Sequence, residues 1–178
     1  MSNKVYYNNQ HVAGWVHNII RSMSIESWRP DYIVGLTRGG LVPANMLSQY
    51  LGIPMHALNV SFRDSDLGPE SNLWMATDAF GYEDYDPMAS GSGKKKILIV
   101  DDINDSGATL NWIKEDWRSG CLPHDERWDN EIWNNNVRFA VLINNEASEF
   151  KNVDFVGKYI NKVENPEWCV FPWENWWE

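Results

Sequence analysis

The most constraining part of the chain is the stretch Ile97–Leu110, in which an apolar run leads into acidic residues and then into the start of a helix. Ile97–Val100 is entirely aliphatic, which is typical of a central strand buried on both faces of a parallel sheet. Asp101 and Asp102 follow this run directly. Open α/β folds bind their ligands at the carboxyl ends of their strands. The stretch therefore predicts a polar ligand site at that edge of an α/β sheet.

The residues after the acidic pair predict that the ligand carries phosphate. Asp105 is followed by Ser106, Gly107, Ala108 and Thr109, which open an apolar-periodic segment. A helix N-terminus offers unpaired backbone N–H groups and the positive end of the helix dipole, so it attracts phosphate. A glycine lets an anion approach the backbone closely, and the two hydroxyls add donors. Nearby carboxylates suit ribose hydroxyls and Mg²⁺, so the pattern favours a sugar phosphate.

The rest of the sequence alternates between helical and extended patterns, which predicts a parallel α/β sheet within one domain, residues 1–178. Residues 62–93 are rich in Asp, Gly, Pro and Ser; they read equally as a movable lid over a site or as a plain surface loop. Residues 121–136 give no clear pattern. The expected helices are Asn9–Ser22, a helix with Pro43 in its first turn that ends at Leu51, and Ala108–Ser119; the expected strands are Asp31–Leu36, Met55–Ser61, Ile97–Val100, Val137–Ile143 and Val153–Ile160.

Composition and charge limit the classes of partner. The formal net charge is −10, whereas a protein that neutralises nucleic-acid phosphates needs a basic face, so we expect no nucleic-acid partner. We find neither a signal-peptide pattern nor an apolar run of membrane length, and expect no membrane partner. The two cysteines, Cys121 and Cys169, form no paired motif, which favours a reduced, cytoplasmic setting. The four histidines are scattered and predict no zinc site.

A second glycine-containing loop follows the strand expected at Asp31–Leu36. Here Arg38, Gly39 and Gly40 lie between that strand and the next expected helix. Arginine supplies charge and a fork of donors that fits phosphate oxygens, and the glycines permit a close backbone approach. By itself the loop also fits an ordinary strand-to-helix turn with a surface arginine.

The two loops together resemble those of the type I phosphoribosyltransferases. The stretch Ile97–Thr109 is similar to their signature for phosphoribosyl pyrophosphate (PRPP), and Val34–Pro43 is similar to their pyrophosphate-binding loop. The resemblance implies the type I phosphoribosyltransferase fold, with a lid loop and a small C-terminal hood over a mostly parallel sheet. It also implies Mg²⁺ as cofactor, held partly through PRPP by Asp101 and Asp102, and Asp105 as the catalytic residue that handles a proton on the base. The residues that it implies for PRPP binding are Arg38, Gly39, Asp101, Asp102, Asp105, Ser106, Gly107, Ala108 and Thr109.

The C-terminal segment Trp168–Glu174 resembles that of bacterial xanthine-guanine phosphoribosyltransferases. The resemblance implies that Trp168 stacks on the base, that Cys169 meets the base edge, and that residues 161–178 form the hood. Those enzymes carry a lysine after the strand expected at Val137–Ile143, where this chain has Asn144 or Asn145. We take Asn144 as the third base-binding residue, because an amide still donates a hydrogen bond although it lacks charge.

The resemblance implies a purine-salvage enzyme that transfers the 5-phosphoribosyl group of PRPP to a nucleobase, with an oxopurine (guanine, xanthine or hypoxanthine) as the expected acceptor. Two alternatives remain. One is a phosphoribosyltransferase for another base, and the other is a PRPP- or nucleotide-sensing protein that has lost catalysis, since a fold does not prove an activity. The resemblance and the many aromatic residues also suggest a homodimer or homotetramer.

Overall fold

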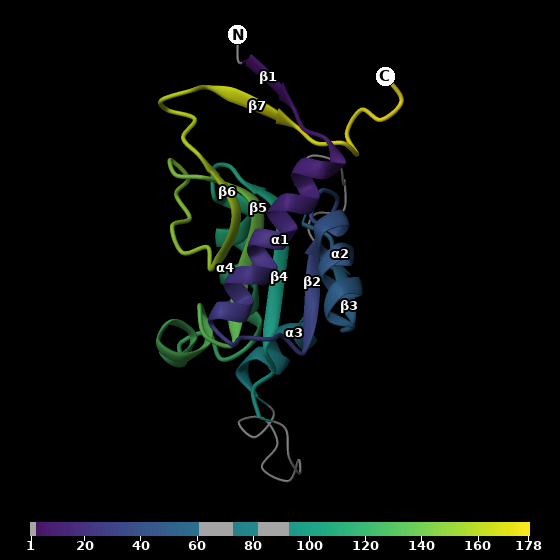
Figure 1. The fold of residues 1–178 in the computed structure, drawn as a ribbon. Helices are drawn as coiled ribbons and strands as arrows, with labels where there is room; N and C mark the ends of the chain where they lie inside the picture. The colour runs from purple at the N-terminus through teal and green to yellow at the C-terminus, as the bar shows by residue number, and fades with distance from the viewer. Residues whose placement is uncertain (1–2, 61–72, 82–92) are drawn as a thin grey trace.

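A five-stranded sheet lies at the centre of the computed structural model, which describes residues 3–60, 73–81 and 93–178 (Figure 1). The strands of this sheet are β2 (Tyr32–Leu36), β3 (Met55–Leu58), β4 (Ile97–Asn104), β5 (Val137–Asn145) and β6 (Phe155–Ile160). Their order is β3-β2-β4-β5-β6, and every neighbouring pair is parallel. The predicted α/β class with a parallel sheet is therefore confirmed.

Helices cover both faces of the sheet. They are α1 (Asn9–Ile25), α2 (Leu41–Leu51), α3 (Leu73–Phe80) and α4 (Ala108–Gly120). Successive side chains of a strand point to opposite faces. Accordingly, Leu98 and Val100 join the apolar cluster under α1 and α2, whereas Ile97 and Ile99 join the cluster under α3 and α4. In Figure 1, α1 runs in front of the sheet while α4 lies on the other side. Burial on both faces explains why the β4 sequence begins as an unbroken aliphatic run.

Local signals set the helix ends. The side chain of Asn8 accepts a hydrogen bond from the backbone N–H of His11, whose ring accepts one from the N–H of Asn8, so the two residues cap α1. Gly52 ends α2 with φ 65°, a left-handed conformation that glycine adopts at little cost. The helices are slightly longer than expected, since α1 continues to Ile25 and α2 begins at Leu41.

The strands differ more from expectation than the helices do. β4 does not end before the acidic pair but continues through Asp101 and Asp102 to Asn104, because this segment still pairs with β5, whose own end is Asn145. In contrast, β3 ends at Leu58 rather than Ser61, and β6 begins at Phe155 rather than Val153.

The expected lid falls mostly on residues 61–72 and 82–92, which lie outside the described residues. The middle of that stretch is not loop but α3, whose Met75, Ala79 and Phe80 are fully buried against the sheet. The helical spacing of these apolar residues is a usable signal, but the polar residues on both sides of the helix conceal it.

Residues 121–136, which gave no pattern, contain a short π-helical turn at Trp128–Ile132. Two of the eleven tryptophans stack here: the ring centroids of Trp128 and Trp133 lie 5.2 Å apart. Trp117 of α4 and Phe139 of β5 pack against Trp133, with ring centroids 6.0 Å and 5.9 Å from that of Trp133. This part of the tryptophan content therefore builds core, as large aromatic side chains usually do.

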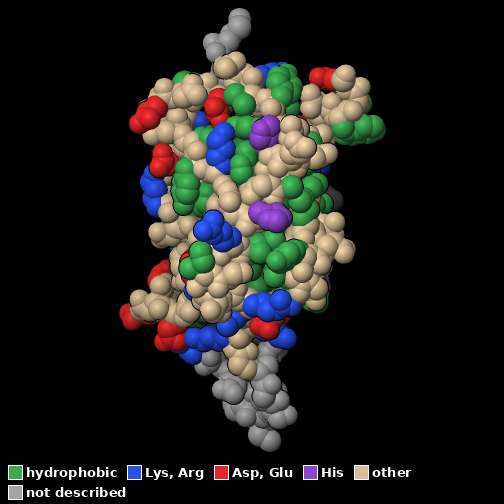
Figure 2. Space-filling view, in the orientation of Figure 1, with side chains coloured by type: hydrophobic (Ala, Val, Ile, Leu, Met, Phe, Trp, Pro, Cys, Tyr) green, Lys and Arg blue, Asp and Glu red, His purple; other side chains and the backbone are tan. Residues whose placement is uncertain are grey.

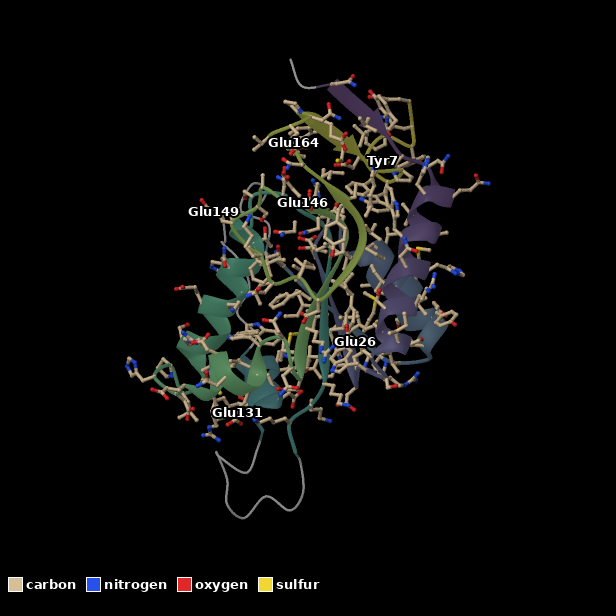
Figure 3. The ribbon with its side chains drawn as sticks, turned by 60° about the vertical axis from the view of Figure 1, so that its left-hand side comes forward. Tyr7, Glu26, Glu131, Glu146, Glu149 and Glu164 are labelled. Carbon is tan, nitrogen blue, oxygen red and sulfur yellow. The ribbon has the colours of Figure 1, made fainter. Side chains whose placement is uncertain are left out.

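A second, two-stranded sheet lies beyond the carboxyl ends of the main strands (Figure 1). Its strands are β1 (Asn3–Tyr6) and β7 (Glu167–Val170), which run parallel although they come from opposite ends of the chain. Tyr7 holds the junction, because its hydroxyl donates to Glu167 Oε1 at 3.2 Å and accepts from Lys158 Nζ at 3.0 Å. Figure 3 shows Tyr7 where β1 passes into α1. The small sheet thus joins the C-terminal segment to the N-terminal helix.

The surface in front of α1 carries charges of both signs. In Figure 2, lysine and arginine side chains on this face are interspersed with acidic and apolar ones, most densely at the lower end. Ion pairs near that end include Lys94 with Glu131 at 2.8 Å (Glu131 is labelled in Figure 3).

Within the described residues, no helix is long and apolar enough to cross a bilayer.

Candidate active site

A cavity of about 590 Å³ opens between the carboxyl ends of β2 and β4 and the C-terminal segment. Its lining comes mainly from three parts of the chain that lie far apart in the sequence: the loop after β2, the segment from β4 into α4, and the C-terminal segment from Lys162 to Glu174. The lining residues used below are Arg38, Gly39, Asp101, Asp102, Asp105, Ser106, Gly107, Ala108, Thr109, Lys162, Trp168, Cys169, Phe171 and Glu174. This is the edge at which open α/β sheets bind ligands.

The loop from β4 into α4 has the geometry of an anion site. Gly107 precedes the first residue of the 13-residue α4 with φ 93°, a left-handed conformation that favours glycine. A Cβ atom there would lie 2.5 Å from the backbone nitrogen of Phe150, so a side chain would not fit. Ser106, Ala108 and Thr109 surround the helix start and line the cavity. The helix N-terminus therefore faces a space in which phosphate oxygens can accept hydrogen bonds from its N–H groups.

Asp101 and Asp102 stand side by side in the last part of β4 and are only partly exposed. Oδ1 of Asp101 accepts the N–H of Asp102 at 2.9 Å, and Oδ1 of Asp102 accepts the N–H of Ile103 at 2.8 Å. Burial raises the pKa of Asp102 to about 6, with a smaller rise from Glu174. Burial and the neighbouring carboxylate raise the pKa of Asp101 well above its usual range. The pair therefore carries negative charge at a cost that a bound cation would relieve.

The loop after β2 packs its glycines directly onto β4. A Cβ atom at Gly40 would lie 2.4 Å from the carbonyl oxygen of Val100, and one at Gly39 would lie 1.9 Å from Oδ2 of Asp102. The loop also contains a cis peptide bond between Thr37 and Arg38. Arg38 lines the same cavity as the acidic pair. The two glycine-containing loops singled out in the sequence are thus neighbours in space.

The structure does not bring Asn144 to the cavity, in contrast to the expectation for a base-binding residue. Asn144 is 8% exposed, and its Oδ1 accepts from Nδ2 of Asn104 at 2.7 Å. Asn104 also donates to the carbonyl of Phe150 and accepts from the hydroxyl of Ser148. These bonds tie the end of β4 to the loop after β5. Asn144 therefore helps to hold the end of β4 against β5, because its amide bonds a residue of the neighbouring strand rather than facing the open cavity.

Asn145 and Lys162 hold Asp105 from the side of β5 and β6. Nδ2 of Asn145 donates to the carbonyl oxygen of Asp105 at 3.0 Å, and Nζ of Lys162 lies 2.8 Å from Oδ2 of Asp105. The sequence reasoning missed Lys162. Its position just after β6 was an available signal, because the ends of parallel strands in one sheet converge on the same edge. A shallower pocket beside the main cavity shares Asp105 and Lys162 and reaches the loop that carries Glu146 and Glu149 (Figure 3).

The C-terminal segment brings aromatic surface to the cavity. Trp168 is 47% exposed and lines it, whereas its neighbour Cys169 is 8% exposed. Burial raises the pKa of the Cys169 thiol to about 11, so this group stays neutral near pH 7. Oε2 of Glu174 accepts the backbone N–H of Phe171 at 2.7 Å and fixes the turn that follows β7. An exposed indole beside buried neighbours gives a planar ligand a face on which to stack.

The chain belongs to the phosphoribosyltransferase family: the profile of the phosphoribosyl transferase domain matches residues 3–174. Xanthine phosphoribosyltransferase 1 of Saccharomyces cerevisiae is 23% identical over 192 aligned positions, which cover 96% of this chain and 88% of that protein. Xanthine-guanine phosphoribosyltransferase of Gluconobacter oxydans is 27% identical over 143 positions, covering 80% of this chain and 67% of the relative. The resemblance to this family that the sequence motifs of the present chain predicted is therefore confirmed.

Solved structures agree on the fold. The purine phosphoribosyltransferase of Pyrococcus horikoshii superposes with a TM-score of 0.63 at 25% identity, covering 97% of this chain and 95% of that one. The xanthine-guanine-hypoxanthine phosphoribosyltransferase of Helicobacter pylori has a TM-score of 0.65 at 16% identity, covering 98% and 95%. The α/β arrangement described above is thus the arrangement of known phosphoribosyltransferases.

Proposed function

We propose that this protein transfers the 5-phosphoribosyl group of PRPP to an oxopurine, releasing pyrophosphate and a nucleoside monophosphate. The observation that carries the proposal is the cavity itself, in which the N-terminus of α4, the acidic pair and the exposed Trp168 ring face one space. Relatives named as xanthine and hypoxanthine-guanine phosphoribosyltransferases support the choice of acceptor.

In this proposal the 5′-phosphate of PRPP accepts hydrogen bonds from the backbone N–H groups between Ser106 and Thr109. The ribose hydroxyls donate to Asp101 and Asp102, and Arg38 pairs with the pyrophosphate. The expected roles of Gly39 and Gly107 are to let the backbone approach, since a Cβ atom would meet the Asp102 carboxylate at Gly39 and the backbone of Phe150 at Gly107. The ligand then lies across the edge of β2 and β4, which the lining of the cavity supports.

The donor set of the acidic pair fits Mg²⁺, which prefers carboxylate, phosphate and water oxygens. Within the described residues, no three His, Cys, Asp or Glu side chains converge as a metal site. We therefore infer that Asp101 and Asp102 would supply at most part of the coordination, with PRPP and water supplying the rest. The ion would neutralise charge on the leaving pyrophosphate.

The proposed reaction breaks one bond at the anomeric carbon, forms another there and transfers one proton. The bond from the anomeric carbon to the pyrophosphate oxygen breaks, a ring nitrogen of the base bonds to that carbon, and the proton on this nitrogen passes to the carboxylate of Asp105. Positioning and charge stabilisation would contribute most of the rate. Asn145 fixes the backbone carbonyl of Asp105, and Lys162 keeps the Asp105 carboxylate at the cavity wall, where it can reach a bound base.

Pyrophosphate release from PRPP and Mg²⁺ with guanine, xanthine, hypoxanthine, adenine, uracil and orotate tests the proposal. We expect release with at least one oxopurine and none from PRPP without a base. Release with adenine or a pyrimidine only would replace the acceptor, whereas PRPP binding measured by calorimetry without release from any base would contradict transferase activity.

A further inference from the structure

Lys162 is a cation that the structure places at the cavity wall beside the residue proposed to take the proton. Its Nζ lies 2.8 Å from Oδ2 of Asp105, and its side chain is 18% exposed. Its backbone N–H donates to Oδ1 of Asn145 at 3.1 Å. The same asparagine donates to the carbonyl oxygen of Asp105 at 3.0 Å. Asn145 thus holds both members of the ion pair at a fixed separation.

The turn that carries Lys162 is itself well braced. Asn161 Oδ1 accepts the backbone N–H groups of Val163 at 3.1 Å and of Glu164 at 3.4 Å. The carbonyl oxygen of Asn161 also accepts the N–H of Asn165 at 2.9 Å. A long lysine side chain normally loses much conformational entropy when it is ordered. Here the backbone is held, and the ion pair with Asp105 orders the far end of the side chain.

Lys162 belongs to the segment between β6 and β7, and β7 carries the exposed Trp168. Cys169, which follows Trp168 in β7, lines the cavity together with Lys162 and Asp105. Cys169 is the neighbour of the exposed Trp168, and Lys162 and Trp168 line the same cavity. Arg38, the other cation of the lining used here, belongs to the loop after β2. Among the described residues that line the cavity, Lys162 is therefore the cation nearest in the chain to the expected base-stacking residue Trp168.

We propose that Lys162 determines which bases are accepted, by donating a hydrogen bond to a ring carbonyl oxygen of the base that stacks on Trp168. An ammonium group has three donors and no acceptor. One donor is used by Asp105, and the others can meet an oxo group. An amino group at the same position of the ring would set donor against donor. The inference rests on the proposed function, and it assigns to a residue after β6 the recognition that was expected from Asn144.

A structural role for Lys162 makes a different prediction. If the ammonium only held Asp105, its removal would displace the proton acceptor and lower kcat for every base by the same factor. A role in recognition instead raises KM for oxopurines and leaves the affinity for an aminopurine unchanged or improved. The ratio between the two kinds of base therefore separates the two roles.

The experiment compares wild type with Lys162→Met, which keeps the length of the side chain without its donors, and Lys162→Gln, which retains a neutral donor. KM and kcat are measured with the best oxopurine, and adenine is titrated as a competitive inhibitor of that reaction. Lys151→Met is the matched control, since Nζ of Lys151 donates to the carbonyl oxygen of Glu146 and lies outside the cavity lining. Thermal midpoints show whether each variant is folded.

We expect Lys162→Met to lower kcat/KM for the oxopurine by about 10–100-fold, mainly through KM, as for a lost hydrogen bond to a charged donor. Adenine should inhibit at least as well as in wild type, Lys162→Gln should fall between the two, and Lys151→Met should match wild type. A loss confined to kcat, or an equal weakening of oxopurine KM and adenine inhibition, in both folded variants would overturn the assignment of Lys162 while leaving the transferase function intact. Wild type that is inactive with every oxopurine would instead refute the proposed function.

Discussion

Gly39 and Asp102 touch so closely that a Cβ atom at Gly39 would lie 1.9 Å from Oδ2 of the carboxylate. Gly39 belongs to the loop after β2 and Asp102 to the end of β4, so this contact joins the two segments that carry the expected PRPP contacts. A side chain at Gly39 would therefore have to displace the Asp102 carboxylate.

The first prediction concerns this contact. Gly39→Ala should lower kcat/KM for PRPP by at least about 10-fold, because a displacement of about 1 Å in a catalytic site is enough for a large loss. Gly14→Ala is the control: Gly14 lies inside α1, a Cβ there would meet nothing within 4 Å, and alanine should stabilise the helix by about 0.5–1 kcal/mol. Steady-state kinetics and thermal denaturation measure both. Wild-type kinetics in Gly39→Ala would show that the loop can move away from β4 without cost.

The second prediction concerns pH and the acidic pair. Burial raises the pKa of Asp102 from its usual 3.8 to about 6, so the folded state binds more protons than the unfolded state between these values. The free energy of unfolding therefore decreases as the pH rises through this window, and the full cost is present above about pH 6. Asp102→Asn should raise stability at pH 7.5 by about 1–2 kcal/mol, or roughly 2–8 °C in Tm.

The same variant should show little gain at pH 4, where the wild-type carboxylate is largely protonated, and it should lose activity with PRPP and Mg²⁺. Asparagine keeps an oxygen that can accept the N–H of Ile103, so the local backbone should be preserved. Thermal denaturation across this pH range, without ligand, is the measurement. A Tm gain that is equally large at pH 4 and pH 7.5 would mean that the charge of Asp102 is not its source.

The third prediction concerns Asp105. Asp105→Asn keeps the size of the side chain but removes the proton acceptor, and it should lower kcat by about 10²–10⁴-fold, the usual contribution of a positioned acid–base group. Binding of PRPP, measured by calorimetry, should change much less, because backbone N–H groups make the phosphate contacts in this proposal. Glu115→Gln, an exposed change on α4, serves as the control. Turnover close to wild type in Asp105→Asn would remove this residue from proton transfer.

The fourth prediction concerns Trp168. Trp168→Ala should raise KM for the base by about 5–100-fold, which corresponds to the loss of one stacked aromatic face. The KM for PRPP should stay near wild type, because the phosphate contacts lie on other loops. Trp177→Ala, which removes an indole that is 65% exposed and outside the cavity lining, is the matched control. If the two alanine variants behave alike, Trp168 is a surface residue rather than part of the base site.

Local patterns predicted much of the fold and one half of the site. The aliphatic run of β4, the acidic pair and the glycine at the start of α4 follow one another along the chain, so their relation is set by neighbouring residues. The loop around Arg38 was recognised for the same reason. In both cases backbone geometry and residue type act over a few positions, and a strand followed by a glycine turn and a helix leaves little freedom.

The other half of the site depends on contacts between residues that are distant in the sequence. β1 and β7 are too short to be predicted alone, and they exist because the two ends of the chain pair with each other. Asn144 and Asn145 are adjacent residues of β5, yet one amide bonds Asn104 inside the sheet and the other bonds Asp105 beside the cavity. Lys162 reaches Asp105 from a different strand. Periodicity shows which residues are buried, but only the packing of strands decides which side chain faces a shared cavity, because that depends on register and on the direction of every neighbouring chain segment.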